Sequence, residues 1–129
     1  MRLLIDTHCW LWMCAEPERL SARTRSILLD PATIRLLSVA SMWELSIKYD
    51  LGKLRLPAAP HDFVPSRLAT TVTQPLPITD AHALRVGLLP RVHRDPFDRM
   101  IVAQALVEGI PVLSADRVFG DYEIDRLKP

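Results

Sequence analysis

Glycine and long apolar runs are both scarce in this sequence of 129 residues. With four glycines in the whole chain, the G-x-G-x-x-G loop that follows the first strand of a dinucleotide-binding domain is absent. No apolar run approaches the roughly 20 residues that a membrane-spanning helix requires. The N-terminal run "RLLI" is interrupted at Asp6, so we expect neither a signal peptide nor a membrane segment.

Cysteine and net charge are low as well. Cys9 and Cys14 lie on one short segment, where a disulfide across a single helix is geometrically poor. We therefore expect two reduced thiols in a cytoplasmic protein. The four histidines show no zinc-ligand spacing. A net charge of +1 does not indicate a nucleic-acid binder. It does not exclude one either, because acids clustered around metal ions would leave the remaining surface more basic.

Apolar residues make up 49% of the chain, which predicts one globular domain over residues 1–129. Short apolar runs alternate with segments of helical length. The expected strands are 2–5, 33–40, 72–78 and 110–114, with an edge strand in the tail 117–129. The expected helices are 7–16, 21–30, 41–52, 61–70, 79–89 and 95–109. This alternation predicts an α/β sandwich with a central, mainly parallel sheet of four to five strands.

The segment "HRDPFDRMIVAQA", residues 93–105, places two aspartates at the start of a predicted helix. Asp95 precedes Pro96, and Asp98 follows three residues after Asp95. An acid at the N-cap, proline at N1 and an acid at N3 form a common helix start. The first N–H groups there lack partners, and the helix dipole favours negative charge. On this segment alone, capping accounts for both acids.

Other acids are predicted to lie at the same rim of the sheet. Asp6 ends the first strand, and Asp116 follows the strand 110–114. Glu44 lies one turn into the helix that follows the second strand. Parallel α/β sheets carry their functional residues at the carboxyl ends of the strands. We therefore expect these acids to converge there with Asp98.

Each acid also has a purely structural interpretation. Asp6 could cap the next helix, Glu44 could close a capping box with Ser41, and Asp116 could hold a turn. Together these interpretations are less satisfactory, because carboxylates that converge on one rim repel one another. A divalent cation removes that repulsion, and Mg²⁺ and Mn²⁺ prefer hard oxygen ligands. The pattern therefore favours metal-assisted phosphoryl chemistry.

These motifs carry a family resemblance. "LLIDTH", Glu44 on the third helix, "RDPFDRMIVAQA" and "VLSAD" together resemble a PIN domain, in particular the VapC-type toxin ribonucleases of type II toxin–antitoxin pairs. The resemblance covers nearly the whole chain and implies a PIN-like α/β/α sandwich with metal-dependent endoribonuclease activity. It also implies an antitoxin partner and a homodimer.

Carried over by position, the resemblance implies an acidic quartet of Asp6, Glu44, Asp98 and Asp116. Asp6 and Asp98 would mainly hold a Mg²⁺ ion, for which Mn²⁺ is a plausible substitute. Glu44 and Asp116 would hold its waters or a second ion. Ser114 matches a small hydroxyl position near the last acid and is a candidate contact to substrate.

The basic residues near the acids have two interpretations. They are either ordinary solvated charges or contacts to the RNA backbone. The set comprises Arg91, His93 and Arg94 before the acids, and Lys48, Lys53 and Arg55 in and after the third helix. The tryptophans are likewise either core residues or the wall of a groove for a partner. These are Trp10, Trp12 and Trp43.

Two other functional classes fit the predicted fold. A phosphate-accepting receiver domain would have an adjacent acid pair near the first strand and a lysine after a late strand. "VLSADR" supplies no such lysine. A non-catalytic RNA- or protein-binding α/β module remains an alternative. It would keep the fold and lose the acids, whereas all four are present here.

Overall fold

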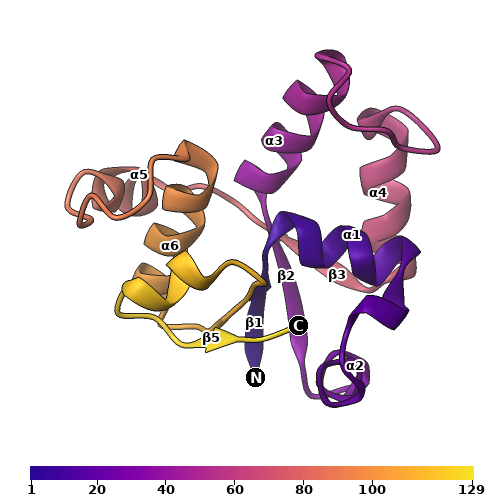
Figure 1. Ribbon diagram of the computed structural model, residues 1–129, viewed down its shortest axis with the longest axis horizontal. Helices are drawn as coiled ribbons and strands as arrows, with labels where there is room; N and C mark the ends of the chain where they lie inside the picture. Colours follow the sequence, from indigo (N-terminus) through magenta and orange to yellow (C-terminus); the bar gives the residue numbers. More distant parts are fainter.

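Five parallel strands form the central sheet of the computed structural model, which describes residues 1–129 (Figure 1). They are β1 (Arg2–Ile5), β2 (Ile34–Ser38), β3 (Thr73–Leu76), β4 (Val112–Leu113) and β5 (Arg126–Leu127). Their order across the sheet is β3-β2-β1-β4-β5. Because β1 is central and all strands are parallel, the residues after β1, β2 and β4 meet at one rim. The predicted parallel sheet, including the edge strand in the tail, is confirmed.

Six α-helices and two short 3₁₀ helices connect the strands. They are α1 (Thr7–Ala15), α2 (Ala22–Leu29), α3 (Val39–Asp50), α4 (Pro60–Thr70), α5 (Asp80–Val86) and α6 (Pro96–Glu108), with η1 (Pro17–Arg19) and η2 (Arg117–Asp121). Helix α5 is shorter than predicted because it ends at Val86, with Gly87 as the C-cap. Strand β4 begins later than predicted, at Val112, because Pro111 has no N–H for a ladder. None of the helices has the length and hydropathy that crossing a bilayer requires.

The two faces of the sheet bury separate apolar clusters, because successive side chains of a strand point to opposite faces. Leu4 of β1 packs with Ile101 and Val102 of α6. Leu3 and Ile5 of the same strand pack against α1, α2, α3 and α4. Figure 1 shows α5 and α6 on one side of the strands and α1, α3 and α4 on the other. The predicted α/β/α sandwich is therefore confirmed.

The start of α3 differs from the prediction. Ser38 is the N-cap, and its hydroxyl accepts a hydrogen bond from the N–H of Ala40 (3.0 Å). The cap therefore lies three residues before Ser41, the predicted cap. The predicted capping box of Ser41 and Glu44 is wrong, because the strand-end serine already satisfies the helix start. Glu44 consequently lies on the second turn of α3, where its side chain serves no cap.

The cysteines match their prediction as thiols. Cys9 and Cys14 are both free, with Cys9 buried under β1 and Cys14 half-buried. Burial raises the pKa of the Cys9 thiol to about 12 and that of Cys14 to about 11. Neither thiol is therefore a reactive thiolate near neutral pH.

Candidate functional site

Asp6 lies at the carboxyl end of β1, where its two carboxylate oxygens accept hydrogen bonds from different parts of the chain. One carboxylate oxygen accepts the N–H of His8 (2.8 Å) and caps α1. The other accepts the hydroxyl of Ser114, which follows β4 (2.5 Å). The side chain is buried, and both interpretations of Asp6, cap and site residue, are compatible with this position.

Glu44 reaches the same rim from the second turn of α3. Its Oε1 accepts the hydroxyl of Thr7 (2.8 Å), and Thr7 is linked in turn to the hydroxyl of Ser41 (2.8 Å). Its Oε2 pairs with Lys48 Nζ (2.5 Å), one helical turn further on. The Glu44 side chain is only 3% exposed, so both oxygens of a buried carboxylate are satisfied by the protein itself.

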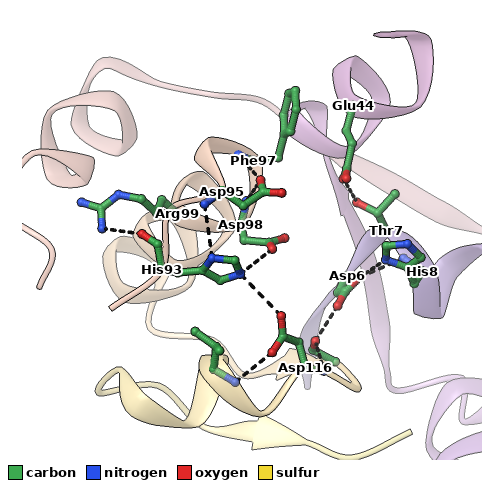
Figure 2. Close-up of polar contacts among 12 residues, drawn as sticks. Asp6, Thr7, His8, Glu44, His93, Asp95, Phe97, Asp98, Arg99 and Asp116 are labelled. Atoms are coloured by element: carbon green, nitrogen blue, oxygen red, sulfur yellow. Dashed lines mark hydrogen bonds and ion pairs between the residues drawn. The ribbon is translucent and has the colours of Figure 1, made fainter. Parts of the chain in front are cut away.

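The start of α6 assigns different tasks to its two acids. Asp95 is the N-cap: its carboxylate accepts the N–H groups of Phe97 (2.8 Å) and Asp98 (3.2 Å). The side chain of Asp98 caps nothing and points toward Asp6 and Asp116 (Figure 2). The prediction that Asp95 caps the helix is confirmed, and Asp98 is free for another role.

His93 joins Asp98 and Asp116 in a cluster that the sequence did not predict. His93 Nε2 lies 2.9 Å from Asp98 Oδ2 and 3.5 Å from Asp116 Oδ2 (Figure 2). Its Nδ1 accepts the N–H of Asp95 (3.2 Å), so a neutral ring carries its proton on Nε2. The protonated Nε2 therefore lies beside the two carboxylates, but it forms no hydrogen bond with either of them.

Asp116 is the most exposed of the predicted quartet, with 42% of its side chain accessible. One oxygen accepts the N–H of Val118 (2.9 Å) and starts η2, while its own N–H donates to the hydroxyl of Ser114 (3.0 Å). Ser114 thus ties the Asp116 loop to Asp6. The loop turns toward the other acids, so the position of Asp116 confirms the turn and is compatible with the site interpretation.

The carboxylates influence one another electrically. Burial raises the pKa of Asp98 to about 7, and the charges of Asp95 and Asp6 push in the same direction. Burial also raises the pKa of Asp6, with hydrogen bonds from Ser114 and His8 opposing the change. The hydrogen bond to Glu44 raises the pKa of Lys48, as do the more distant charges of Asp95 and Asp98. His93 opposes the rise at Asp98, but burial and the neighbouring carboxylates outweigh it.

A cavity of about 280 Å³ opens among these acids, with Asp6, Asp98 and Asp116 on its wall beside His8 and Trp12. One ligand atom each from His93, Asp98 and Asp116 lies within 4.8 Å of the others. Because Nε2 of His93 carries the proton in this orientation, the ligands that this cluster offers are the two carboxylates. The donor set is dominated by carboxylate oxygens, which suits Mg²⁺ or Mn²⁺. The residues present therefore fit a hard divalent cation.

The structure separates the alternatives for Ser114 and for two of the tryptophans. Ser114 is fully buried, so it positions Asp6 and does not fit a direct contact to substrate. Trp10 is also fully buried and packs edge-on against Phe63, which makes it a core residue. Trp43 is 59% exposed on α3 and contacts Phe97 at the start of α6.

The sequence suggested Lys48 and His93 only as possible contacts to RNA, so their contacts with the acids were not predicted, and it gave Thr7 no role of its own. The spacing of Glu44 and Lys48 is the i,i+4 spacing of helical ion pairs and could have indicated their contact. His93 lies two residues before Asp95, but a search for zinc spacing does not detect a histidine that joins acids brought from a distant loop. Thr7 follows Asp6 directly, and nothing in its type distinguishes it from a helix-start residue.

The chain is an α/β protein with an acidic cavity at the carboxyl rim of a five-stranded parallel sheet. The PIN domain family matches residues 3–124, nearly the whole chain, and the chain belongs to that family. Ribonuclease VapC16 of Mycobacterium tuberculosis (strain ATCC 25618 / H37Rv) is 44% identical over 59 residues. That match covers 46% of this chain and 42% of the relative, so the chain spans less than half the length of the curated relative it matches.

Solved structures share the fold over almost their full length. VapBC2 from Rickettsia felis, bound to a DNA fragment from their promoter, superposes with a TM-score of 0.75 at 13% identity, covering 100% of this chain and 99% of that one. DNA-bound VapBC from Salmonella typhimurium superposes with a TM-score of 0.69 at 15% identity, covering 99% of this chain and 98% of that one. FitAcB from Neisseria gonorrhoeae superposes with a TM-score of 0.64 at 20% identity, covering 97% of this chain and 96% of that one. The resemblance to PIN domains inferred from the motifs is confirmed.

Proposed function

We propose that this protein is a metal-dependent endoribonuclease that hydrolyses RNA phosphodiester bonds, and that it is the toxin of a toxin–antitoxin pair. The carrying observation is the acidic cavity, which is lined by Asp6, Asp98 and Asp116. His93 is the one ion-pair partner of the Asp98 carboxylate, and burial and neighbouring carboxylates raise the pKa of Asp98 to about 7. Folding alone gives no reason for this crowding, whereas a bound cation does.

Mg²⁺ is the ion we propose, with Mn²⁺ as a substitute. Asp6 and Asp98 would be its main ligands, with Asp116 across the cavity. Glu44, whose oxygens already accept Thr7 and Lys48, is suited to an outer position in which it orients water. His93 presents an N–H to the acids, so it adds no nitrogen ligand in this orientation.

The chemistry that the ion supplies when bound is Lewis-acid activation of water and of the phosphate. The chain's own residues hold and orient the reacting groups. Asp6 is fixed by Ser114 and by the first turn of α1, so its carboxylate cannot swing away. No side chain in the cavity forms a nucleophile–base pair, which favours direct hydrolysis over a covalent enzyme intermediate.

Two protein partners belong to the proposal. The similar solved structures include VapBC2 from Rickettsia felis and VapBC from Salmonella typhimurium. The relative from Mycobacterium tuberculosis is named a ribonuclease. By that likeness we propose an antitoxin that covers the rim, and a homodimer. The exposed indole of Trp43, packed on Phe97 beside Asp98, gives a partner an apolar anchor at the rim.

RNA cleavage by the purified chain, freed of any partner, tests the proposal. We expect cleavage of single-stranded or looped RNA with Mg²⁺ or Mn²⁺, no cleavage in EDTA, and none by Asp98→Asn. Asp121→Asn, an exposed acid in η2, is the matched control and should cut normally. Binding of RNA without cleavage under all conditions would instead favour the non-catalytic binding module. Equal cleavage with metal and with EDTA would overturn the metal mechanism.

A further inference from the structure

A second cavity, of about 520 Å³, lies beside the acidic one in the connection between α5 and α6. Four residues line it, and none is apolar: Arg91, His93, Arg94 and Arg99. Three guanidinium charges therefore face one space, and no carboxylate is on its wall. Like charges held together in this way favour an anion between them.

Arg99 differs from the other two arginines because its guanidinium is engaged by the protein. It donates to the backbone carbonyls of Val86 (3.0 Å), Pro90 (3.0 Å) and His93 (3.4 Å). These carbonyls belong to the end of α5 and to the connection that follows it. Arg99, from the first turns of α6, thus holds this irregular segment in place, and the segment carries the rest of the cavity wall.

Arg91 and Arg94 have free guanidinium groups. Both residues are exposed, and neither side chain forms a hydrogen bond or ion pair with another residue. Guanidinium groups match phosphate oxygens with two parallel hydrogen bonds, which makes an arginine pair on one wall a phosphate contact by chemistry. Ordinary solvated arginines need no shared cavity and no third arginine that fixes their backbone.

His93 forms the partition between the two cavities. Its ring faces Asp98 and Asp116 on one side, and the residue lines the arginine cavity on the other. A strand of RNA whose scissile phosphate lies in the acidic cavity would therefore bring a neighbouring phosphate to the arginines. The two cavities have opposite charge, as the two tasks require: one binds a cation, the other an anion.

We propose that Arg91 and Arg94 form a subsite for one non-scissile, internal phosphodiester of the RNA strand, and that Arg99 is the positioning residue of that subsite. The inference rests on the proposed cleavage of RNA and names the contact that keeps the strand in register. Arg91 and Arg94 touch the phosphate, whereas Arg99 acts through the backbone that it holds.

Binding of a short single-stranded RNA, measured by fluorescence anisotropy in EDTA so that nothing is cut, tests the subsite. We expect Arg91→Ala/Arg94→Ala to weaken binding about tenfold. The slope of log affinity against log salt should fall by about 0.7, the value for one phosphate of a single strand. Arg23→Ala, an exposed arginine on α2, is the control and should change neither quantity. An unchanged affinity and slope in the double variant would overturn the subsite.

A series of RNAs, each with one uncharged methylphosphonate linkage, identifies the phosphate. One internal linkage should weaken binding to the parent protein and have no further effect on the double variant. If removal of a terminal phosphate gives that pattern instead, the cavity binds a phosphate monoester and the internal assignment is wrong. If every linkage behaves alike in both proteins, no single phosphate is held there and the proposal fails.

Arg99 needs a separate readout. Arg99→Lys keeps the charge but cannot reach three carbonyls, so it should lose the same affinity and salt slope as Arg99→Ala. Full rescue by lysine would mean that Arg99 contacts phosphate directly, against a positioning role. Failure of the subsite and failure of the enzyme are distinguishable. If only the subsite is wrong, the parent still cleaves RNA with metal, and the double variant keeps the salt slope of the parent. If only the enzymatic function is wrong, the parent binds one phosphate specifically but cleaves no RNA.

Discussion

The acidic site has two halves that solve the problem of buried charge differently. In the inner half, Asp6 and Glu44 have a protein donor on every carboxylate oxygen: His8 and Ser114 for the first, Thr7 and Lys48 for the second. In the outer half, the side chain of Asp98 accepts no hydrogen bond and only faces the ring of His93. Asp116 faces the same ring, and only its other oxygen has a donor, the N–H of Val118.

This difference separates what folding fixes from what a ligand must complete. The inner carboxylates are satisfied once the chain has folded, so a cation adds little to their hydrogen bonding. Burial raises the pKa of both Asp6 and Asp98, but two hydrogen bonds oppose the rise at Asp6, whereas like charges add to it at Asp98. The ionised form of Asp98 therefore depends more on an added positive charge. The outer half therefore gains most from metal binding, and the inner half provides the rigid wall against which that metal is held.

Asp6→Asn should give the largest effect, on cleavage and not on folding. Asparagine caps helices about as well as aspartate, so α1 keeps its start and the stability in EDTA should change little. Loss of one ligand charge should lower RNA cleavage more than about 100-fold, since even outer-shell changes cost 10–100-fold. Cleavage assays with urea unfolding check both halves of the prediction. A variant that unfolds easily yet still cuts would make Asp6 a structural residue.

Lys48→Met tests whether the inner half is a closed network. The substitution leaves Glu44 Oε2 buried without a donor, which should cost about 1–3 kcal/mol of unfolding free energy. Lys53→Met, an exposed lysine just beyond α3, is the matched control and should be nearly neutral. Urea unfolding in EDTA measures both. Equal effects in the two variants would mean that the ion pair with Glu44 contributes nothing.

A smaller effect should distinguish the outer half by its dependence on pH. The folded-state pKa of Asp98 is about 7, above the ordinary value of 3.8, so the folded protein holds this proton more tightly than the unfolded chain. The stability of the parent in EDTA should therefore fall as pH rises from about 4 through about 7, and level off above. Asp98→Asn lacks this group, so its advantage over the parent should grow across the same window. A constant difference in urea unfolding would contradict the crowding at Asp98.

The regular elements that position the site could be predicted from the sequence. "RLLI" followed by Asp6 and "HRDPFDRMIVAQA" have the periodicity and caps that identify a buried strand and a helix, and both lie where expected. The acids after them follow from strand direction in a parallel sheet.

The contacts among the site residues could not be predicted in the same way. Ser38 and Ser41 both precede a helical pattern, and only the length of β2 decides that Ser38 is the cap. His93 meets Asp116 across 23 residues of sequence, through a connection whose path depends on Arg99 and three carbonyls. Such pairings arise from tertiary packing, which leaves no periodic signal.

Thermal unfolding of the parent and of Asp98→Asn, each in EDTA and in Mg²⁺, tests the central claim most directly. The claim is that Asp98 is a metal ligand in a crowded outer half. In EDTA the variant should be at least as stable as the parent, because one repelling charge is gone. In Mg²⁺ the parent should gain stability by an amount set by ion concentration over its dissociation constant, and the variant should gain much less. Three results together would contradict the account. The variant would be less stable than the parent in EDTA, by the roughly 0.3–1 kcal/mol of a lost helix-start charge. It would also gain as much stability from Mg²⁺ as the parent does, and it would still cleave RNA.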